Sequence, residues 1–316
     1  MPSSRQLAHE WPYPRHDKFV EDLKKAAHEW FTSRECKVDE KHGYCLANLS
    51  DWESNIILKE VPEYVIGIRK ERESKKQGFP LHDYVHHGLS SQALLFNLIV
   101  PLIVRKDVDL LRDLINSRGI AWPGSNSQAV LEYEDRTVFN EDRGQPTSID
   151  LVIGDPAKVG ALFIESKLVE TGFGGCSVFN QGDCDGSNPS QNLSRCYLHH
   201  IGRLYWSLLK EYKFLDGPLS QGSVCILGVH YQFFREVLVA LKKNGYFILL
   251  SDSRSPTFYC SGPSGERGLM PLLISFVPEQ FRKSIGHISI QDVVQAIKAS
   301  GRHDWIDEFK LKYGIN

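Results

Sequence analysis

The segment 148–167 constrains the fold most strongly, because its pattern predicts a β-hairpin. Two apolar stretches of strand length, Ser148 to Ile153 and Ala161 to Lys167, lie on either side of a turn signal, Gly154-Asp155-Pro156-Ala157. Lys158 to Gly160 completes the connection. We therefore expect these two strands to pair antiparallel inside a larger sheet.

The register of this hairpin decides which side chains meet. If the turn centres near Ala157 and Lys158, Asp150 faces Glu165 across the pair. Because side chains alternate along a strand, Glu165 and Lys167 share one face. Asp150, Glu165 and Lys167 are therefore predicted to converge on one face of one hairpin.

These charged groups on an apolar hairpin suggest a metal site. Two neighbouring carboxylates repel each other, and a divalent cation removes that conflict. Mg²⁺ prefers one or two carboxylates together with water and substrate phosphate. Lys167 would then stabilise charge on the phosphate or help to activate water. Glu-x-Lys patterns also occur elsewhere in polar segments, so a structural ion pair at the strand end is the alternative.

The rest of the chain alternates predicted helices and strands in the order expected for an α/β fold with a mixed central β-sheet flanked by helices. Ser90 is a plausible N-cap for the helix that follows it. The basic run 69–76 is typical of a solvated helix face, with a phosphate-contacting patch as the alternative. The predicted helices are 17–33, 93–104, 107–117, 194–210, 233–243, 290–299 and 303–312, and the further predicted strands are 128–133, 224–229 and 246–250.

Composition limits the possible partners and compartment. The chain has 316 residues and a formal net charge of −2, so any nucleic-acid surface must be a local basic patch. Met1 to Arg15 is polar, without the apolar core of a signal peptide, and Ala93 to Val104 is too short to span a bilayer. We therefore expect no membrane contact, and seven cysteines in a chain of this length favour a reducing, cytoplasmic location.

Several motifs together resemble the PD-(D/E)XK nuclease superfamily. The hairpin patterns Thr147-Ser148-Ile149-Asp150 and Phe163-Ile164-Glu165-Ser166-Lys167 carry the resemblance. Further segments are similar to one uncharacterised bacterial branch with a restriction-endonuclease-like core, and the similarity spans Leu89 to Leu250. These segments are Ser90 to Asn97, Gly174-Gly175-Cys176 and Gly202-Arg203-Leu204-Tyr205-Trp206.

The resemblance implies a restriction-endonuclease-like α/β core and metal-dependent phosphodiester hydrolysis. It implies that Asp150 and Glu165 bind Mg²⁺, for which Mn²⁺ substitutes, and that Lys167 is the catalytic lysine. We expect an N-terminal helical extension at 1–85, the nuclease core at 86–260 and a C-terminal helical extension at 261–316.

One position departs from the family pattern. Many members carry a glutamate on the helix before the core strands, where this chain has Gln92. Glu132 or Glu134, which the pattern places on one face of the preceding strand, would supply the missing metal ligand, and Glu134 is favoured. Gln92, Gln191 and Arg195 are predicted to contact nucleic acid.

Cysteines after the hairpin suggest a second metal site. Cys176, Cys184, Cys196 and His200, or its neighbour His199, form a set that suits a structural Zn²⁺ site, although the spacing is irregular. An iron–sulfur cluster, as some members of this nuclease class carry, would need a fourth thiolate from Cys45 or Cys225. Separate, unliganded thiols are the leading alternative.

These observations favour a Mg²⁺-dependent endonuclease that cuts DNA, expected to be double-stranded, in restriction or defence against foreign DNA. A homodimer is expected, because cutting both strands usually requires two active sites. The alternative from a different class is a non-catalytic nucleic-acid-binding or assembly protein that retains the nuclease core. An RNA substrate is equally compatible with the sequence.

Overall fold

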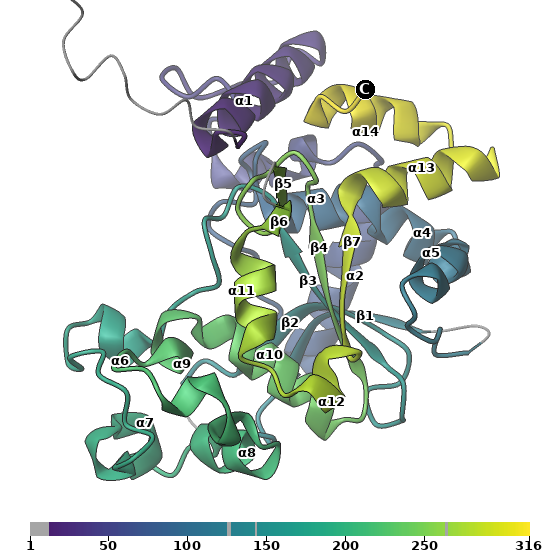
Figure 1. The fold of residues 1–316 in the computed structure, drawn as a ribbon. Coiled ribbons are helices and arrows are strands. Elements are labelled where there is room, and N and C mark those ends of the chain that lie inside the picture. Colours follow the sequence, from purple (N-terminus) through teal and green to yellow (C-terminus); the bar gives the residue numbers. More distant parts are fainter. Residues whose placement is uncertain (1–12, 125–127, 143, 263–264) are drawn as a thin grey trace, which may run out of the picture.

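A five-stranded mixed sheet forms the centre of the computed structural model (Figure 1), which describes residues 13–124, 128–142, 144–262 and 265–316. Most of the polar stretch Met1–Arg15 therefore lies outside the described residues. The strand order is β1-β2-β3-β4-β7; β1, β2 and β3 run antiparallel, whereas β3, β4 and β7 run parallel. The strands are β1 (Ala129–Asp135), β2 (Thr147–Ile153), β3 (Leu162–Lys167), β4 (Tyr246–Ser251) and β7 (Ile285–Ser289).

Helices cover both faces of the sheet and bury a separate hydrophobic core on each. The first core is packed by helices from the two ends of the described chain: α1 (His16–Ser33), α2 (Glu60–Ser74), α3 (Ser91–Leu98), α4 (Val100–Val104), α5 (Arg112–Ser117), α13 (Ile290–Ser300) and α14 (Trp305–Tyr313). The second core is packed by α8 (Tyr205–Glu211), α10 (Tyr231–Lys242) and α11 (Leu269–Ser275).

Short elements make up most of the remaining structure. The short helices α6, α7 and α9 gather beside α8 at the lower left of Figure 1. The bounds are α6 (Ser177–Asn180), α7 (Tyr197–His200), α9 (Ile226–Val229), α12 (Glu279–Arg282), the hairpin β5 (Cys260–Gly262) and β6 (Gly265–Arg267), and the 3₁₀ turns η2 (Leu49–Asn55), η3 (Val108–Leu111), η4 (Leu193–Arg195), η5 (Phe214–Asp216) and η6 (Pro218–Ser220).

The fold class predicted from the sequence is confirmed. Strands β1 to β4 and helices α1, α10, α13 and α14 lie within a few residues of their predicted positions. Ser90 is the N-cap of α3, since its hydroxyl accepts a hydrogen bond from the backbone N–H of Ala93 at 3.2 Å. Pro101 lies in the first turn of α4, so the predicted helix 93–104 is divided between α3 and α4.

Three expectations about elements are wrong. The predicted helix 194–210 is interrupted at Gly202, whose φ of 81° leaves the right-handed helical region. The predicted strand 224–229 is also wrong: the segment lies outside the sheet, and Ile226–Val229 forms helix α9, whose first turn the Cys225 sulfur caps. Strand β7 was missed, and it lies in the segment expected to be a helical extension.

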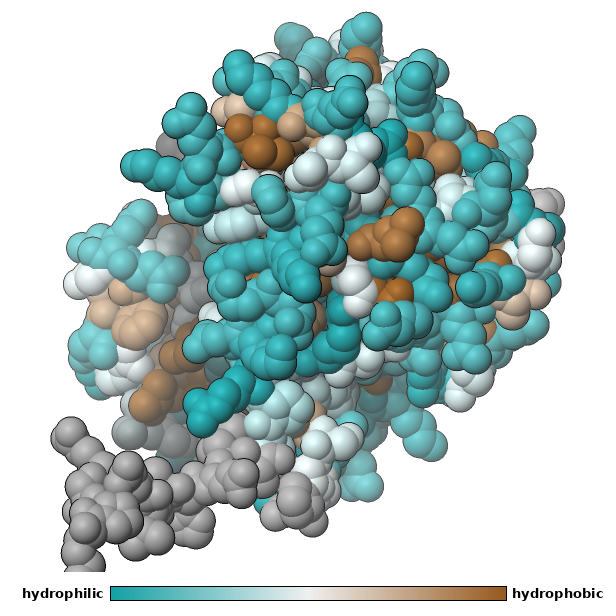
Figure 2. Space-filling view, turned by 90° about the horizontal axis from the view of Figure 1, so that it is seen from above, coloured by the Kyte–Doolittle hydropathy of each residue, from teal (hydrophilic) through white to brown (hydrophobic). Residues whose placement is uncertain are grey.

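The surface visible from above the view of Figure 1 is mainly hydrophilic. Hydrophobic side chains gather there only in small, separate groups (Figure 2). In the described part of the chain, no helix has both the length and the apolar character needed to cross a membrane.

Candidate active site

Three neighbouring strands bring carboxylates to the same level of the sheet. Val152 pairs with Phe163 between β2 and β3, so the predicted register is confirmed and Asp150 lies opposite Glu165. Between β1 and β2, the register places Glu132 opposite Asp150. A row of acidic side chains therefore crosses β1, β2 and β3.

An unusual backbone conformation directs Glu132 into this row. Its φ of 46° lies in the left-handed region, which a non-glycine residue rarely adopts within a strand. Arg72 of α2 donates hydrogen bonds to the carbonyl oxygens on both sides of the distortion, those of Leu131 and Glu132. Glu132 is buried in the cavity, whereas Glu134 lies beside Gly78, outside it. The expectation that both glutamates share a face is therefore wrong.

Gln92 holds Glu132 in place from α3. Its side-chain amide donates to Glu132 Oε1 at 2.6 Å, and its carbonyl oxygen accepts from the backbone N–H of His82 at 2.9 Å. Ser148 also donates to Glu132 Oε2 at 3.3 Å. The helix position that carries glutamate in the related nucleases thus contacts the acidic row here through an amide, and Glu132 supplies the carboxylate.

Lys167 lies at the other side of the row. Its Nζ is 2.7 Å from Glu165 Oε1 and donates to Gln232 Oε1 at 3.0 Å. Gln232, on α10, also donates to Glu165 Oε1 at 2.5 Å. Asp150 accepts a hydrogen bond from the backbone N–H of Ser166 at 2.8 Å, which fixes its carboxylate between β2 and β3.

The site contains more carboxylates than cations. Burial and the charge of Glu165 raise the pKa of Asp150 well above its usual value, and the same two causes raise the pKa of Glu236 on α10. Burial also raises the pKa of Glu132 to about 7. Burial alone would lower the pKa of Lys167, but Glu165 and the other nearby carboxylates outweigh it and raise that pKa.

The donor atoms suit a hard cation. Glu165 Oε2 and both carboxylate oxygens of Glu236 are buried and lack a hydrogen-bond partner among the described residues. In those same parts of the chain, no group of three or more His, Cys, Asp or Glu side chains is arranged to hold a metal ion. A site formed by two carboxylates, with water and substrate phosphate completing the shell, is the usual arrangement for Mg²⁺. Asp150 and Glu165 fit that arrangement.

These residues line a cavity of about 330 Å³. Its wall also contains His82 and four residues of α10 that the sequence pattern did not indicate: Tyr231, Gln232, Arg235 and Glu236. One signal was available for this helix. Glu236 interrupts the apolar stripe that includes Phe233 and Val237, and a carboxylate on a buried stripe often has a functional role.

The predicted nucleic-acid contacts are not brought together. Gln92 is buried under Glu132 and cannot reach a ligand at the surface without moving. Gln191 is exposed, and Arg195 forms an ion pair with Asp185 at 3.2 Å in the cysteine-rich region.

The cysteine-rich region forms a second, separate cavity. Cys176, Cys184 and Cys196 line it as expected, and the fourth thiol is Cys225, whereas exposed His200 lies outside its wall. Burial raises the pKa of Cys225 to about 12, and the three other thiols add to that effect. All four cysteines are free thiols.

Comparison with known proteins identifies the family. A family model described as "Restriction Endonuclease associating with ARP" matches residues 24–314. The chain belongs to this restriction-endonuclease family. No curated protein and no solved structure matched the chain. The family and the mixed sheet indicate a restriction-endonuclease-like nuclease, and the family implies a nucleic-acid substrate.

Proposed function

We propose that this family member is a Mg²⁺-dependent DNA endonuclease, with Mn²⁺ as a substitute metal. The observation that carries the proposal is the placement of Asp150 and Glu165 at facing positions of β2 and β3, with Lys167 2.7 Å from Glu165, in one cavity. Glu132 is the proposed third acid, in place of Glu134.

The residues have distinct proposed roles. Asp150 and Glu165 would hold the metal, and Glu132 would add a third negative charge beside them. When bound, Mg²⁺ supplies polarisation of a phosphoryl oxygen and lowers the pKa of a coordinated water. Lys167 stabilises negative charge that develops on the phosphate. Gln232 holds Lys167 and Glu165 in their mutual orientation through its side-chain amide.

The family also suggests a substrate and a biological role. Restriction enzymes act on foreign double-stranded DNA, so we propose double-stranded DNA as the substrate and defence as the role, exerted in the cytoplasm. A homodimer would place one active site at each of the two DNA strands. The chain's net charge of −2 means that DNA binding requires local basic groups.

The decisive experiment measures cleavage of plasmid, linear DNA and RNA by purified protein with Mg²⁺, Mn²⁺ or EDTA. Asp150→Ala and Lys167→Ala should each lower the cleavage rate by about 10²–10⁴-fold, because each removes a group that acts on the reacting phosphate. Lys158→Ala is the matched control, since Lys158 lies exposed at the turn of the same hairpin and should leave cleavage unchanged.

Metal binding, followed by calorimetry, separates the alternatives. Mg²⁺ binding that is lost in Asp150→Ala supports the site even where a particular DNA is not cut. A wild-type protein that neither cuts nucleic acid nor binds a divalent metal would contradict the enzyme. It would favour a nucleic-acid-binding protein that retains the nuclease core.

A further inference from the structure

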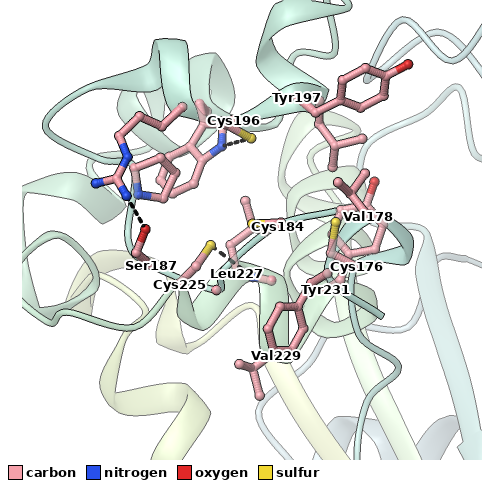
Figure 3. Close-up of a pocket in the computed structure, with 17 residues that line it drawn as sticks. Cys176, Val178, Cys184, Ser187, Cys196, Tyr197, Cys225, Leu227, Val229 and Tyr231 are labelled. Carbon is pink, nitrogen blue, oxygen red and sulfur yellow. Dashed lines mark hydrogen bonds between the residues drawn. The ribbon is translucent and has the colours of Figure 1, made fainter. Parts of the chain in front are cut away.

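Four thiols from separate segments line one cavity outside the acidic row. Cys176 precedes α6, Cys184 follows that helix, Cys196 precedes α7 and Cys225 precedes α9. Figure 3 shows their sulfur atoms around the same space. We propose that Cys176, Cys184, Cys196 and Cys225 bind an iron–sulfur cluster of the [4Fe–4S] type.

The surroundings of the sulfurs suit thiolate ligands. The backbone N–H of Gly228 donates to Cys225 Sγ at 3.3 Å, and the indole N–H of Trp206 donates to Cys196 Sγ at 3.3 Å. Such donors stabilise negative charge on sulfur and are among the features that tune iron–sulfur clusters. Apolar side chains, including Leu227 and Val229, complete much of the wall and limit access of water.

The size of the cavity favours a cluster over a single ion. Zinc holds its four ligands at about 2.3 Å from one point, so thiolates close around it without leaving a cavity. The cavity that the cysteines line together with their apolar neighbours has a volume of about 40 Å³, which exceeds the roughly 10–15 Å³ that one water-sized group requires. The described cysteines are also not grouped as a single ion would need. A group of several atoms fills such a space, and four thiolates supply its ligands.

The local fold gives the cluster a structural role. Between β3 and α10, the longest helix is α8, with 7 residues, and the chain otherwise forms short turns. Short helices have few hydrogen bonds to stabilise them in isolation. A cluster bound by four segments would join them at one point, so the free energy of metal binding would add to the stability of this region.

The cysteine cavity is connected to the acidic cavity through the start of α10. Tyr231 lines both cavities. The backbone N–H of Cys176 donates to the carbonyl of Gly228 at 2.7 Å, and that of Gln232 donates to the carbonyl of Gly174 at 3.1 Å. A cluster bound by these cysteines would therefore lie next to the segment that presents Gln232 to Lys167.

Purification of the full chain without oxygen tests the proposal directly. Elemental analysis should find about four iron and four acid-labile sulfide per chain, with broad visible absorption. Cys225→Ser and Cys184→Ser should lose most of this iron and absorption. Cys36→Ser should retain both, since Cys36 lies outside the cavity, and exposed His200→Ala should also retain them.

The outcomes are distinct even if a cysteine variant fails to fold, because the wild-type protein alone is informative. Iron and sulfide in comparable amounts support the cluster. One zinc per chain without sulfide would overturn it in favour of a mononuclear site. Protein that stays free of metal after incubation with iron, sulfide and a thiol reductant would also overturn it. None of these results depends on whether the chain cuts DNA.

Discussion

Glu132 combines an uncommon backbone conformation with burial beside other acids. Its left-handed φ of 46° carries a steric cost, and its carboxylate lies in the row with Asp150 and Glu165. The hydrogen bonds from Arg72 and Gln92 oppose that cost by holding the peptide and the carboxylate separately. The fold therefore maintains a locally unfavourable residue at the point where a cation would bind.

The raised pKa of Glu132 predicts a pH-dependent stability in metal-free protein. Because the pKa rises from 4.5 to about 7, the folded state holds this proton more tightly than the unfolded chain. The resulting stabilisation is complete below pH 4.5 and is lost as the pH rises to about 7. The difference in unfolding free energy between wild type and Glu132→Gln, measured by urea denaturation in EDTA, should therefore change across this window.

The control for this prediction is Glu134→Gln, which alters a carboxylate of the same strand outside the cavity. Its unfolding free energy should follow that of the wild type at each pH. Parallel pH profiles for wild type and Glu132→Gln would contradict the assignment. Added Mg²⁺ should reduce the loss of stability near pH 7, because a bound cation offsets the repulsion between carboxylates.

The sequence predicted the geometry of the Asp150, Glu165 and Lys167 group because strand alternation and a single turn determine it. Glu132 was not distinguished from Glu134, because alternation assigns both to one face and a single left-handed residue reverses the result. The contribution of α10 was missed for a different reason. Its contact with β3 joins residues far apart in the chain, which local periodicity does not reveal.

Among the elements, those with a regular apolar pattern were predicted and those controlled by tertiary contacts were not. The hairpin β2–β3 and helix α10 have clear periodicity. Strand β7 is short and contains Gly286 and His287, so its strand conformation depends on pairing with β4. The segment 224–229 has a strand-like apolar composition, yet Cys225 caps a helical turn there.

Replacement of two glycines by alanine should change the stability of the protein in opposite directions. Gly67 lies within α2 with no atom near the position of an added Cβ, so Gly67→Ala should stabilise the protein by about 0.5–1 kcal/mol. Gly245 connects α10 to β4, and an added Cβ would lie 2.4 Å from the carbonyl oxygen of Ala161. Gly245→Ala should therefore destabilise the protein by about 1–3 kcal/mol.

Thermal and urea denaturation of the two glycine variants and the wild type test both predictions, the gain in stability for Gly67→Ala and the loss for Gly245→Ala. Ala161 immediately precedes β3, so its backbone is held by the central sheet and cannot shift freely. Equal stability of Gly245→Ala and the wild type would show that the junction relaxes. It would contradict the close packing of α10 on the sheet.

At the scale of the whole molecule, the ends of the described chain share one core with the sheet. Phe19 of α1 and Phe309 of α14 belong to the same hydrophobic cluster as Ile164 of β3. The last sheet strand, β7, also comes from the segment after residue 260. The terminal segments therefore complete the nuclease core.

This shared core predicts a single cooperative unfolding transition. Trp30, Trp52 and Trp305 report on the terminal segments, and far-UV circular dichroism reports on the whole chain. Their urea transitions should coincide in wild type and in Trp206→Phe, which removes the tryptophan of the second core. A separate, earlier fluorescence transition would indicate that the terminal segments form independent units.

The hydrogen bonds of Arg72 also restrict how two copies can assemble. Strand β1 lies at one end of the sheet order, and an added strand from a second chain would need its free carbonyl groups. Arg72 already occupies those of Leu131 and Glu132, and places a charge at that edge. A second copy that continued the sheet across β1 would therefore have to displace Arg72 from these carbonyl groups. Two copies that pair through other surfaces would keep these hydrogen bonds, and those surfaces would then set the spacing of the two cavities and the stagger of the two cuts.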